Sequence, residues 1–121
     1  MAVELTQRDG YLEVKGSGDL TVEEWIPAEE IPFPPGTRVF IDYSDVRTIA
    51  VPLEVFVHAA RVMAEKRLKV AVLATLDVIF GVSRQTILTA GLPEGEQFAV
   101  FRTREEAVAW LLSPLGCSRP D

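Results

Sequence analysis

The chain has 121 residues, of which 48% are hydrophobic, so it is long enough for one domain to bury a core and too short for two. Its 18 acidic and 12 basic side chains give a net charge of −6, which repels the phosphates of nucleic acids and anionic lipid surfaces. No apolar run approaches the roughly 20 residues of a membrane span, and the N-terminal stretch lacks the features of a secretory signal. We therefore expect a cytoplasmic domain that does not bind nucleic acid directly.

The first third of the chain predicts a β-hairpin followed by a helix. Residues 3–7 and 11–16 have roughly alternating apolar side chains, and the Asp9-Gly10 pair between them favours a tight turn. A capping-box pattern then begins a short helix that carries Trp25. The proline-rich residues 32–37 end that helix and form a loop within the domain.

An apolar strand over residues 39–41 runs into Asp42, Ser44 and Asp45, which we interpret as a polar turn between a strand and a helix. Pro52 suits the first position of that helix, where a missing N–H is not needed. Apolar side chains then recur at helical spacing, and the opposite face carries the charged or polar residues Glu54, His58, Arg61 and Glu65. The sequence therefore predicts an amphipathic helix here.

The last part of the chain predicts two strand–helix units. Residues 69–75 have the near-continuous apolar character of a strand that is covered on both faces. Asp77 is expected to cap a helix that ends at Gly91. Residues 97–101 predict the last strand, and Thr103 caps the last helix.

Alternation of this kind predicts a single α/β domain over residues 1–113, with a C-terminal tail at residues 114–121. We expect a mixed sheet of about five strands, which includes the N-terminal hairpin, and about four helices, two or three of them in a layer on one face. The single cysteine, Cys117, lies in the tail and forms neither a disulfide nor a cysteine-based metal site.

Three stretches resemble the STAS superfamily, which includes anti-sigma-factor antagonists and the cytoplasmic ends of sulfate transporters. Residues 39–49 (VFIDYSDVRTI) resemble the strand and turn before its second helix, and residues 69–75 (KVAVLAT) resemble its central strand. Residues 98–111 (FAVFRTREEAVAWL) resemble its closing strand and helix, and this match is the most specific. The resemblance is strongest to SpoIIAA-like (STAS/SEC14) relatives, and it implies a STAS-like fold and an interaction or regulatory role.

One departure from the family concerns its phosphoswitch. Antagonist-type STAS domains are phosphorylated on a serine in an Asp-Ser-Ser-Gly-like turn at the start of the second helix. The corresponding residues 50–53 (AVPL) carry no hydroxyl, and Ser44 and Thr48 lie several residues upstream. We therefore expect no phosphoswitch here, and we expect the turn at Asp42 only to connect a strand to a helix.

A response-regulator receiver is a rival interpretation, because Asp42 and Thr75 each end a predicted strand. A receiver needs further carboxylates for Mg²⁺ after its first strand and a lysine after its last. This chain offers one Asp19 after the hairpin and Arg102 after the last strand. We therefore disfavour the receiver, and we expect no metal and no cofactor.

A catalytic triad is a second enzymatic alternative. It would require Ser44 and either Asp42 or Asp45 to converge on His58, the only histidine. His58 lies on the predicted polar face of its helix beside Glu54, where a solvated side chain is the more ordinary interpretation. We therefore expect no enzymatic activity.

Two predicted helices carry more apolar residues than one buried face of each helix accounts for. The helix that starts near Asp77 is apolar on more than one side of its first turns, at Val78, Ile79, Phe80 and Val82. The helix before it carries a second apolar stripe at Val55, Ala59 and Val62. A single buried face cannot absorb Val78, Ile79, Phe80 and Val82 together. A deep core in which a third element covers both stripes would bury them, and this alternative stays open. Exposed apolar area of that kind marks a partner or ligand surface.

Two functions follow from these residues. The first is a non-enzymatic interaction module that forms a homodimer or binds a protein partner through the apolar helix surface. The alternative is a carrier of a small apolar ligand or lipid, with a pocket at the strand ends lined by Val78, Ile79, Phe80 and Val82. A flat surface favours the first function and a concave pocket favours the second.

Overall fold

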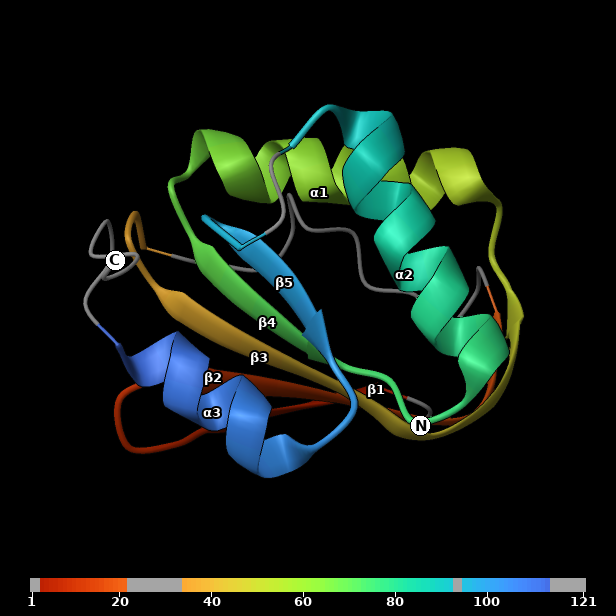
Figure 1. Cartoon of the computed structure of the whole chain (residues 1–121), viewed down its shortest axis with the longest axis horizontal. Coiled ribbons are helices and arrows are strands. Elements are labelled where there is room, and N and C mark those ends of the chain that lie inside the picture. The colour runs from red at the N-terminus through yellow and green to blue at the C-terminus, as the bar shows by residue number, and fades with distance from the viewer. Residues whose placement is uncertain (1–2, 22–33, 93–94, 114–121) are drawn as a thin grey trace.

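The structure, a computed structural model, describes residues 3–21, 34–92 and 95–113. Within these residues the chain forms five strands and three helices (Figure 1). In chain order they are β1 (Val3–Gln7), β2 (Leu12–Thr21), β3 (Arg38–Ala50), α1 (Leu53–Glu65), β4 (Lys69–Leu73), α2 (Asp77–Ala90), β5 (Phe98–Phe101) and α3 (Arg104–Leu112). The helix expected around Trp25 and the cysteine at Cys117 lie outside the described residues.

The sheet is mixed, with strand order β1-β2-β3-β4-β5, as expected from the sequence. β1 and β2 are antiparallel and form the expected N-terminal hairpin, with Gly10 at φ 90° in its turn. All other neighbours are parallel, because a helix or a longer connection returns the chain to the same end of the sheet. The hairpin therefore adds an antiparallel edge to a parallel α/β sheet.

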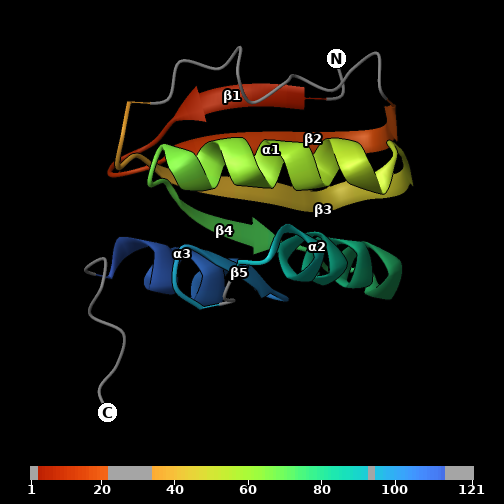
Figure 2. The same cartoon turned by 90° about the horizontal axis from the view of Figure 1, so that it is seen from above.

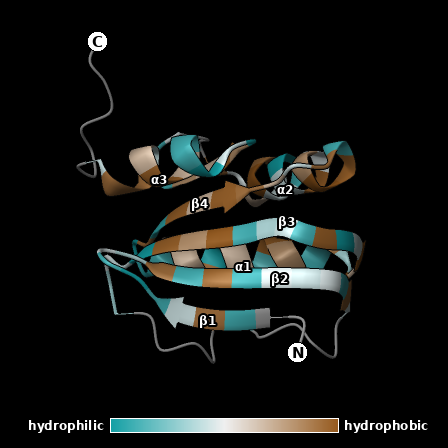
Figure 3. Cartoon of the chain, turned by 90° about the horizontal axis from the view of Figure 1, so that it is seen from below, coloured by the Kyte–Doolittle hydropathy of each residue, from teal (hydrophilic) through white to brown (hydrophobic). Residues whose placement is uncertain are grey.

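Helices cover both faces of the sheet. α1 and α2 lie on one face, where α1 runs over β2 and β3 and α2 lies toward β5, and α3 lies on the other face (Figures 1 and 2). All five residues of β4 are buried, with Val70 and Val72 in the core under α1 and α2 and Ala71 and Leu73 in a smaller core under α3. Figure 3 shows β4 as a hydrophobic strand, as the sequence predicted. None of the described helices combines the length and the apolar composition needed to cross a bilayer.

β3 corrects the expectation of a polar turn. The strand continues for 13 residues to Ala50, so Asp42, Ser44 and Asp45 lie within it. Their polar side chains do not end the strand, because β2 pairs with β3 from Val39 to Ala50. The pairing shifts register at two places along β2, as at a β-bulge, and then continues. Alternation along β3 directs Tyr43 toward α1, whereas Asp42 faces the side of α3.

The helix ends agree with the sequence signals in part. Gly91 ends α2 in the left-handed conformation, and the Thr103 hydroxyl accepts a hydrogen bond from the Glu106 N–H, both as expected. Pro52 precedes the first residue of α1 rather than occupying it. Asp77 lies inside the first turn of α2 and does not cap it, because its carboxylate pairs with a neighbouring arginine instead.

Candidate functional site

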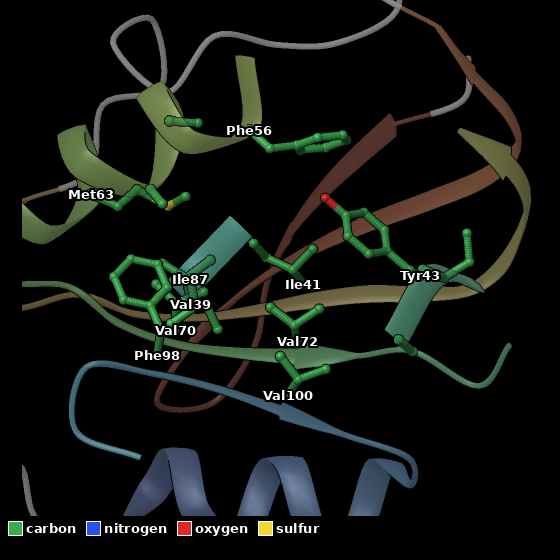
Figure 4. Close-up of a cluster of buried hydrophobic side chains, with 14 of the residues drawn as sticks. Val39, Ile41, Tyr43, Phe56, Met63, Val70, Val72, Ile87, Phe98 and Val100 are labelled. Atoms are coloured by element: carbon green, nitrogen blue, oxygen red, sulfur yellow. The ribbon is translucent and has the colours of Figure 1, made fainter. Parts of the chain in front are cut away.

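A small apolar pocket lies in the wedge between α1, α2 and the sheet. Its floor consists of side chains from β3, β4 and β5, among them Ile41, Val72 and Phe98, and α1 and α2 form its sides (Figure 4). The cavity has a volume of about 50 Å³. An apolar cavity that binds benzene has a volume of roughly 150 Å³. The pocket therefore accepts only a few non-hydrogen atoms unless α1 and α2 move apart.

The pocket forms because short side chains face the sheet where the two helices approach each other. Ala59 and Ala60 of α1 and Ser83 and Thr86 of α2 all line it. Protein interiors normally pack without voids, and longer aliphatic side chains at these positions would fill the space. A small apolar cavity of this kind stays free of water, because it offers few hydrogen-bonding partners.

Tyr43 of β3 adds a polar group to this apolar lining. Only 8% of its surface is exposed. Burial raises the pKa of the Tyr43 phenol, because the charged phenolate would lose its hydration. The side chain therefore remains neutral and protonated at physiological pH.

The structure divides the predicted binding residues among different environments. Ala59 and Val82 line the pocket. Ile79 is only 1% exposed and belongs to the core, whereas Val78 is 64% exposed on the outer side of α2. Because Ala59 and Ile79 are buried, neither contributes a side chain to a flat protein–protein surface.

The remaining predicted residues are half-buried. Val55, Val62 and Phe80 pack against the core under α1 and α2. The guanidinium carbon of Arg102 lies 4.2 Å from the centre of the Phe80 ring, and this arginine also pairs with the carboxylate of Asp77. Phe80 is therefore partly covered by a cation. The seven predicted residues do not form one continuous exposed patch, and their role in binding stays a prediction.

The opposite face of the sheet carries a chain of ion pairs around two buried carboxylates. Glu13 of β2 accepts hydrogen bonds from Arg8 Nε at 3.0 Å and from Arg104 Nη2 at 2.9 Å. An oxygen of Asp42 in β3 lies 3.5 Å from Lys15 Nζ and 3.6 Å from Arg104 Nη1. These contacts join the hairpin to β3 and to the first residue of α3, so we interpret the cluster as structural.

Asp42 has further local partners. Its Oδ1 accepts hydrogen bonds from the Ser44 N–H at 2.9 Å and from the Ser44 hydroxyl at 2.6 Å. Burial alone raises the pKa of Asp42, but the Ser44 hydrogen bonds and the Lys15 ammonium outweigh burial and lower it overall. His58 is exposed on α1, beyond the other face of the sheet. The Ser44, Asp42 and His58 triad is therefore not assembled.

Lys69 is buried under α3, where its ammonium holds the end of that helix. Its Nζ donates to the carbonyl oxygen of Trp110 at 2.7 Å and to the carbonyl oxygen and hydroxyl of Ser113, each at 2.9 Å. Burial, together with the charge of Arg38, lowers the pKa of Lys69. Across the part of the chain that the structure describes, no three His, Cys, Asp or Glu side chains gather closely enough to hold a metal ion.

Sequence interpretation missed Tyr43, Glu13 and Lys69. The sequence held a signal for Tyr43, because in an extended strand its side chain points to the same face as that of Ile41, two residues earlier. The expected turn at Asp42 concealed this signal. Glu13 stands between two apolar residues in a short strand, which is the ordinary pattern of an exposed side chain. Its partner on α3 lies 91 residues away, so no local pattern could predict the pairing.

No family model matches the chain, and no curated protein matches it either. Among solved structures, it is similar to the crystal structure of an uncharacterized protein from the DUF3478 family, with a SpoIIAA-like fold, from Shewanella loihica PV-4. The match covers 91% of this chain and 92% of that chain, with a TM-score of 0.56 and 19% sequence identity. The expected resemblance to SpoIIAA-like relatives is thereby confirmed at the level of the fold. This chain is a single α/β domain with a SpoIIAA-like fold.

Proposed function

We propose that this chain is a non-enzymatic binding module that takes up a small apolar molecule between α1, α2 and the sheet. The apolar pocket in that wedge is the observation that carries the proposal. Transfer of apolar surface from water into such a pocket contributes roughly 25 cal/mol per Å². A ligand with few atoms gains at most about 1.5 kcal/mol per non-hydrogen atom, so we expect dissociation constants between micromolar and millimolar.

The distribution of charge supports binding rather than catalysis. Of the described residues that line the pocket, only Tyr43 is titratable, and burial raises its pKa, so it does not act as a base at neutral pH. The buried carboxylates of Glu13 and Asp42 lie on the other side of the sheet and are paired with cations. The pocket and the charged cluster therefore do not combine into one catalytic site.

An NMR titration with isobutene, a neutral hydrocarbon of only four carbon atoms, tests this proposal. We expect saturable shifts of the methyl signals of Val72 and Ile87, which line the pocket, and none for Leu111 in the core under α3. Val82→Phe places a larger side chain at the pocket and should weaken binding by at least about tenfold. Val78→Phe is the matched control, because Val78 lies on the same helix and is exposed.

Two results would contradict the proposal. The first is the absence of saturable shifts at the pocket methyl groups in the wild-type chain. The second is equal weakening by Val82→Phe and Val78→Phe, which would place the probe outside the pocket.

Self-association is a second candidate function, and the exposed side of α2 is the observation that favours it. Val78 and Leu88 are 64% and 63% exposed, and Leu76, just before the helix, is 45% exposed. Val78 and Leu88 lie ten residues apart on α2, about 80° from each other around the helix axis, so both face the same half of the helix, and exposed apolar side chains on one side of a helix mark an interaction surface. We expect sedimentation velocity to detect a dimer at high protein concentration that the double substitution Val78→Asp, Leu88→Asp abolishes. A monomer at all concentrations would refute this candidate.

A further inference from the structure

Three hydroxyl groups line the pocket, and two of them are already hydrogen-bonded. Ser83 donates to the carbonyl oxygen of Ile79 at 2.9 Å, and Thr86 donates to the carbonyl oxygen of Val82 at 2.8 Å, both within α2. The hydroxyl of Tyr43 has no hydrogen-bond partner among the residues that the structure describes. Within the described part of the chain, one donor therefore has no partner inside an otherwise apolar pocket.

An unpaired buried hydroxyl destabilises a folded protein, because the group loses its hydrogen bonds to water and gains none in return. Phenylalanine at position 43 would fill the same volume without that loss. Packing therefore explains the ring of Tyr43 but not its hydroxyl. A ligand that restores the missing hydrogen bond explains both.

The surroundings of Tyr43 fix the ring and direct its hydroxyl. A Cβ atom at Gly16 on the neighbouring strand would lie 3.4 Å from Cδ1 of Tyr43 and 3.1 Å from Cγ2 of Val46, so the glycine leaves room for the ring. Figure 4 shows the hydroxyl oxygen on the side of the ring that faces Phe56 of α1. The oxygen is thus presented to the space between the sheet and the helices.

The chemistry of the pocket restricts the ligand. Burial raises the pKa of Tyr43, so the phenol keeps its proton and can donate it in a hydrogen bond. An ionised ligand is unsuitable, because its charge would find no counterion among the apolar side chains of the lining. The remaining class is a neutral molecule with an acceptor oxygen.

We propose that the Tyr43 hydroxyl is the polar anchor of this pocket and that its ligand is a small neutral molecule with an apolar body and one carbonyl oxygen. The inference rests on the proposed binding function of the pocket. The carbonyl oxygen accepts a hydrogen bond from the phenol, while the apolar body contacts side chains such as Ile41, Phe56 and Val82.

The test compares two small probes of the same shape, acetone and isobutene, on the wild-type chain and on Tyr43→Phe. NMR titration of the pocket methyl groups gives four dissociation constants. We expect Tyr43→Phe to weaken the binding of acetone by about tenfold and to change the binding of isobutene by less than about twofold. Tyr11→Phe is the matched control, because Tyr11 packs against Phe40 on the other face of the sheet and should change neither constant.

The melting temperature of each variant without a probe supplies an independent readout. The Tyr43→Phe variant should melt at the same temperature as the wild-type chain or at a higher one, because it loses an unsatisfied hydroxyl. A decrease of about 4 °C or more would show that the hydroxyl already has a partner in the free protein, and it would overturn the inference.

The probe results separate the two proposals. If both probes bind and Tyr43→Phe affects them equally, the hydroxyl is not the anchor, and the inference fails while the apolar pocket stands. If the wild-type chain binds neither probe, the proposed binding function itself is wrong, and the inference falls with it.

Discussion

Arg104 and Arg102 offer two comparable substitutions, one beside buried carboxylates and one beside an exposed carboxylate. Their side chains are 44% and 45% exposed, and each lies over a phenylalanine ring. Each donates to a carboxylate, at 2.9 Å to Glu13 and at 2.8 Å to Asp77, and Arg104 also lies 3.6 Å from an oxygen of buried Asp42. The carboxylates differ, because the side chain of Glu13 is 5% exposed and that of Asp77 is 94% exposed.

The expected losses of stability follow from this difference. An exposed ion pair contributes about 0–1 kcal/mol, whereas removing one partner of a buried pair costs about 3–5 kcal/mol. Methionine keeps apolar contact with the ring, so Arg→Met removes mainly the charge. Because Arg8 still donates to Glu13, we expect Arg104→Met to cost about 2–3 kcal/mol and Arg102→Met less than about 1 kcal/mol.

Urea unfolding followed by circular dichroism and by tryptophan fluorescence measures both losses, and coincident transitions with equal slopes establish that the comparison is two-state. Glu13→Gln supplies a further check. It should destabilise the wild-type chain more than the Arg104→Met variant, because in that variant Glu13 retains only Arg8 as a counterion. Two results would refute this account of the cluster: losses for the two arginines that agree within about 0.5 kcal/mol, or an equal cost of Glu13→Gln in both backgrounds.

Three further predictions concern buried titratable groups. Burial raises the pKa of Tyr43 above its ordinary value of 10.0, so the unfolded chain loses the phenol proton first as the pH rises. Above about pH 10 the free energy of unfolding should therefore fall by up to about 1.4 kcal/mol per pH unit relative to Tyr43→Phe. Urea-unfolding free energies that change in parallel with pH for the two chains would contradict this. The pKa of Asp42 is lowered from 3.8, so the free energy of unfolding should decrease as the pH falls below that value. Urea unfolding should show a smaller decrease for Asp42→Asn over the same acid range, because the amide does not titrate. Lys69→Met should cost about 1–3 kcal/mol and speed amide exchange at the end of α3, whereas unchanged exchange would refute its role there.

The elements that could be predicted from the sequence are those with strong local signals. Residues 69–73 form a strand because their side chains are apolar on both faces, and this pattern is visible without any partner. The start of α3 and the end of α2 follow from side-chain and glycine caps at Thr103 and Gly91, which act within one turn of the helix. The mixed α/β sheet follows from the order of these elements, whereas the SpoIIAA-like fold was implied by the resemblance of three stretches of sequence.

The features that the sequence did not predict depend on contacts between distant residues. β3 extends past Asp42 because β2 is long enough to pair with it up to Ala50, and the length of a partner strand is not encoded locally. The placement of Phe80 under Arg102 likewise requires the end of β5 to lie beside α2. The pocket itself depends on how closely two helices approach, which no spacing within either helix specifies.

The extended β3 also explains how one strand serves two unrelated environments. Successive side chains point to opposite faces, so Tyr43 lines the pocket while Asp42, its neighbour in sequence, joins the ion pairs under α3. The sheet separates the two, and the groups share no contact. The effects of Tyr43→Phe and Arg104→Met on the free energy of unfolding should therefore add to within about 0.5 kcal/mol. A larger coupling, measured in the double variant by urea unfolding, would mean that the ion pairs help to shape the pocket across the strand that they share.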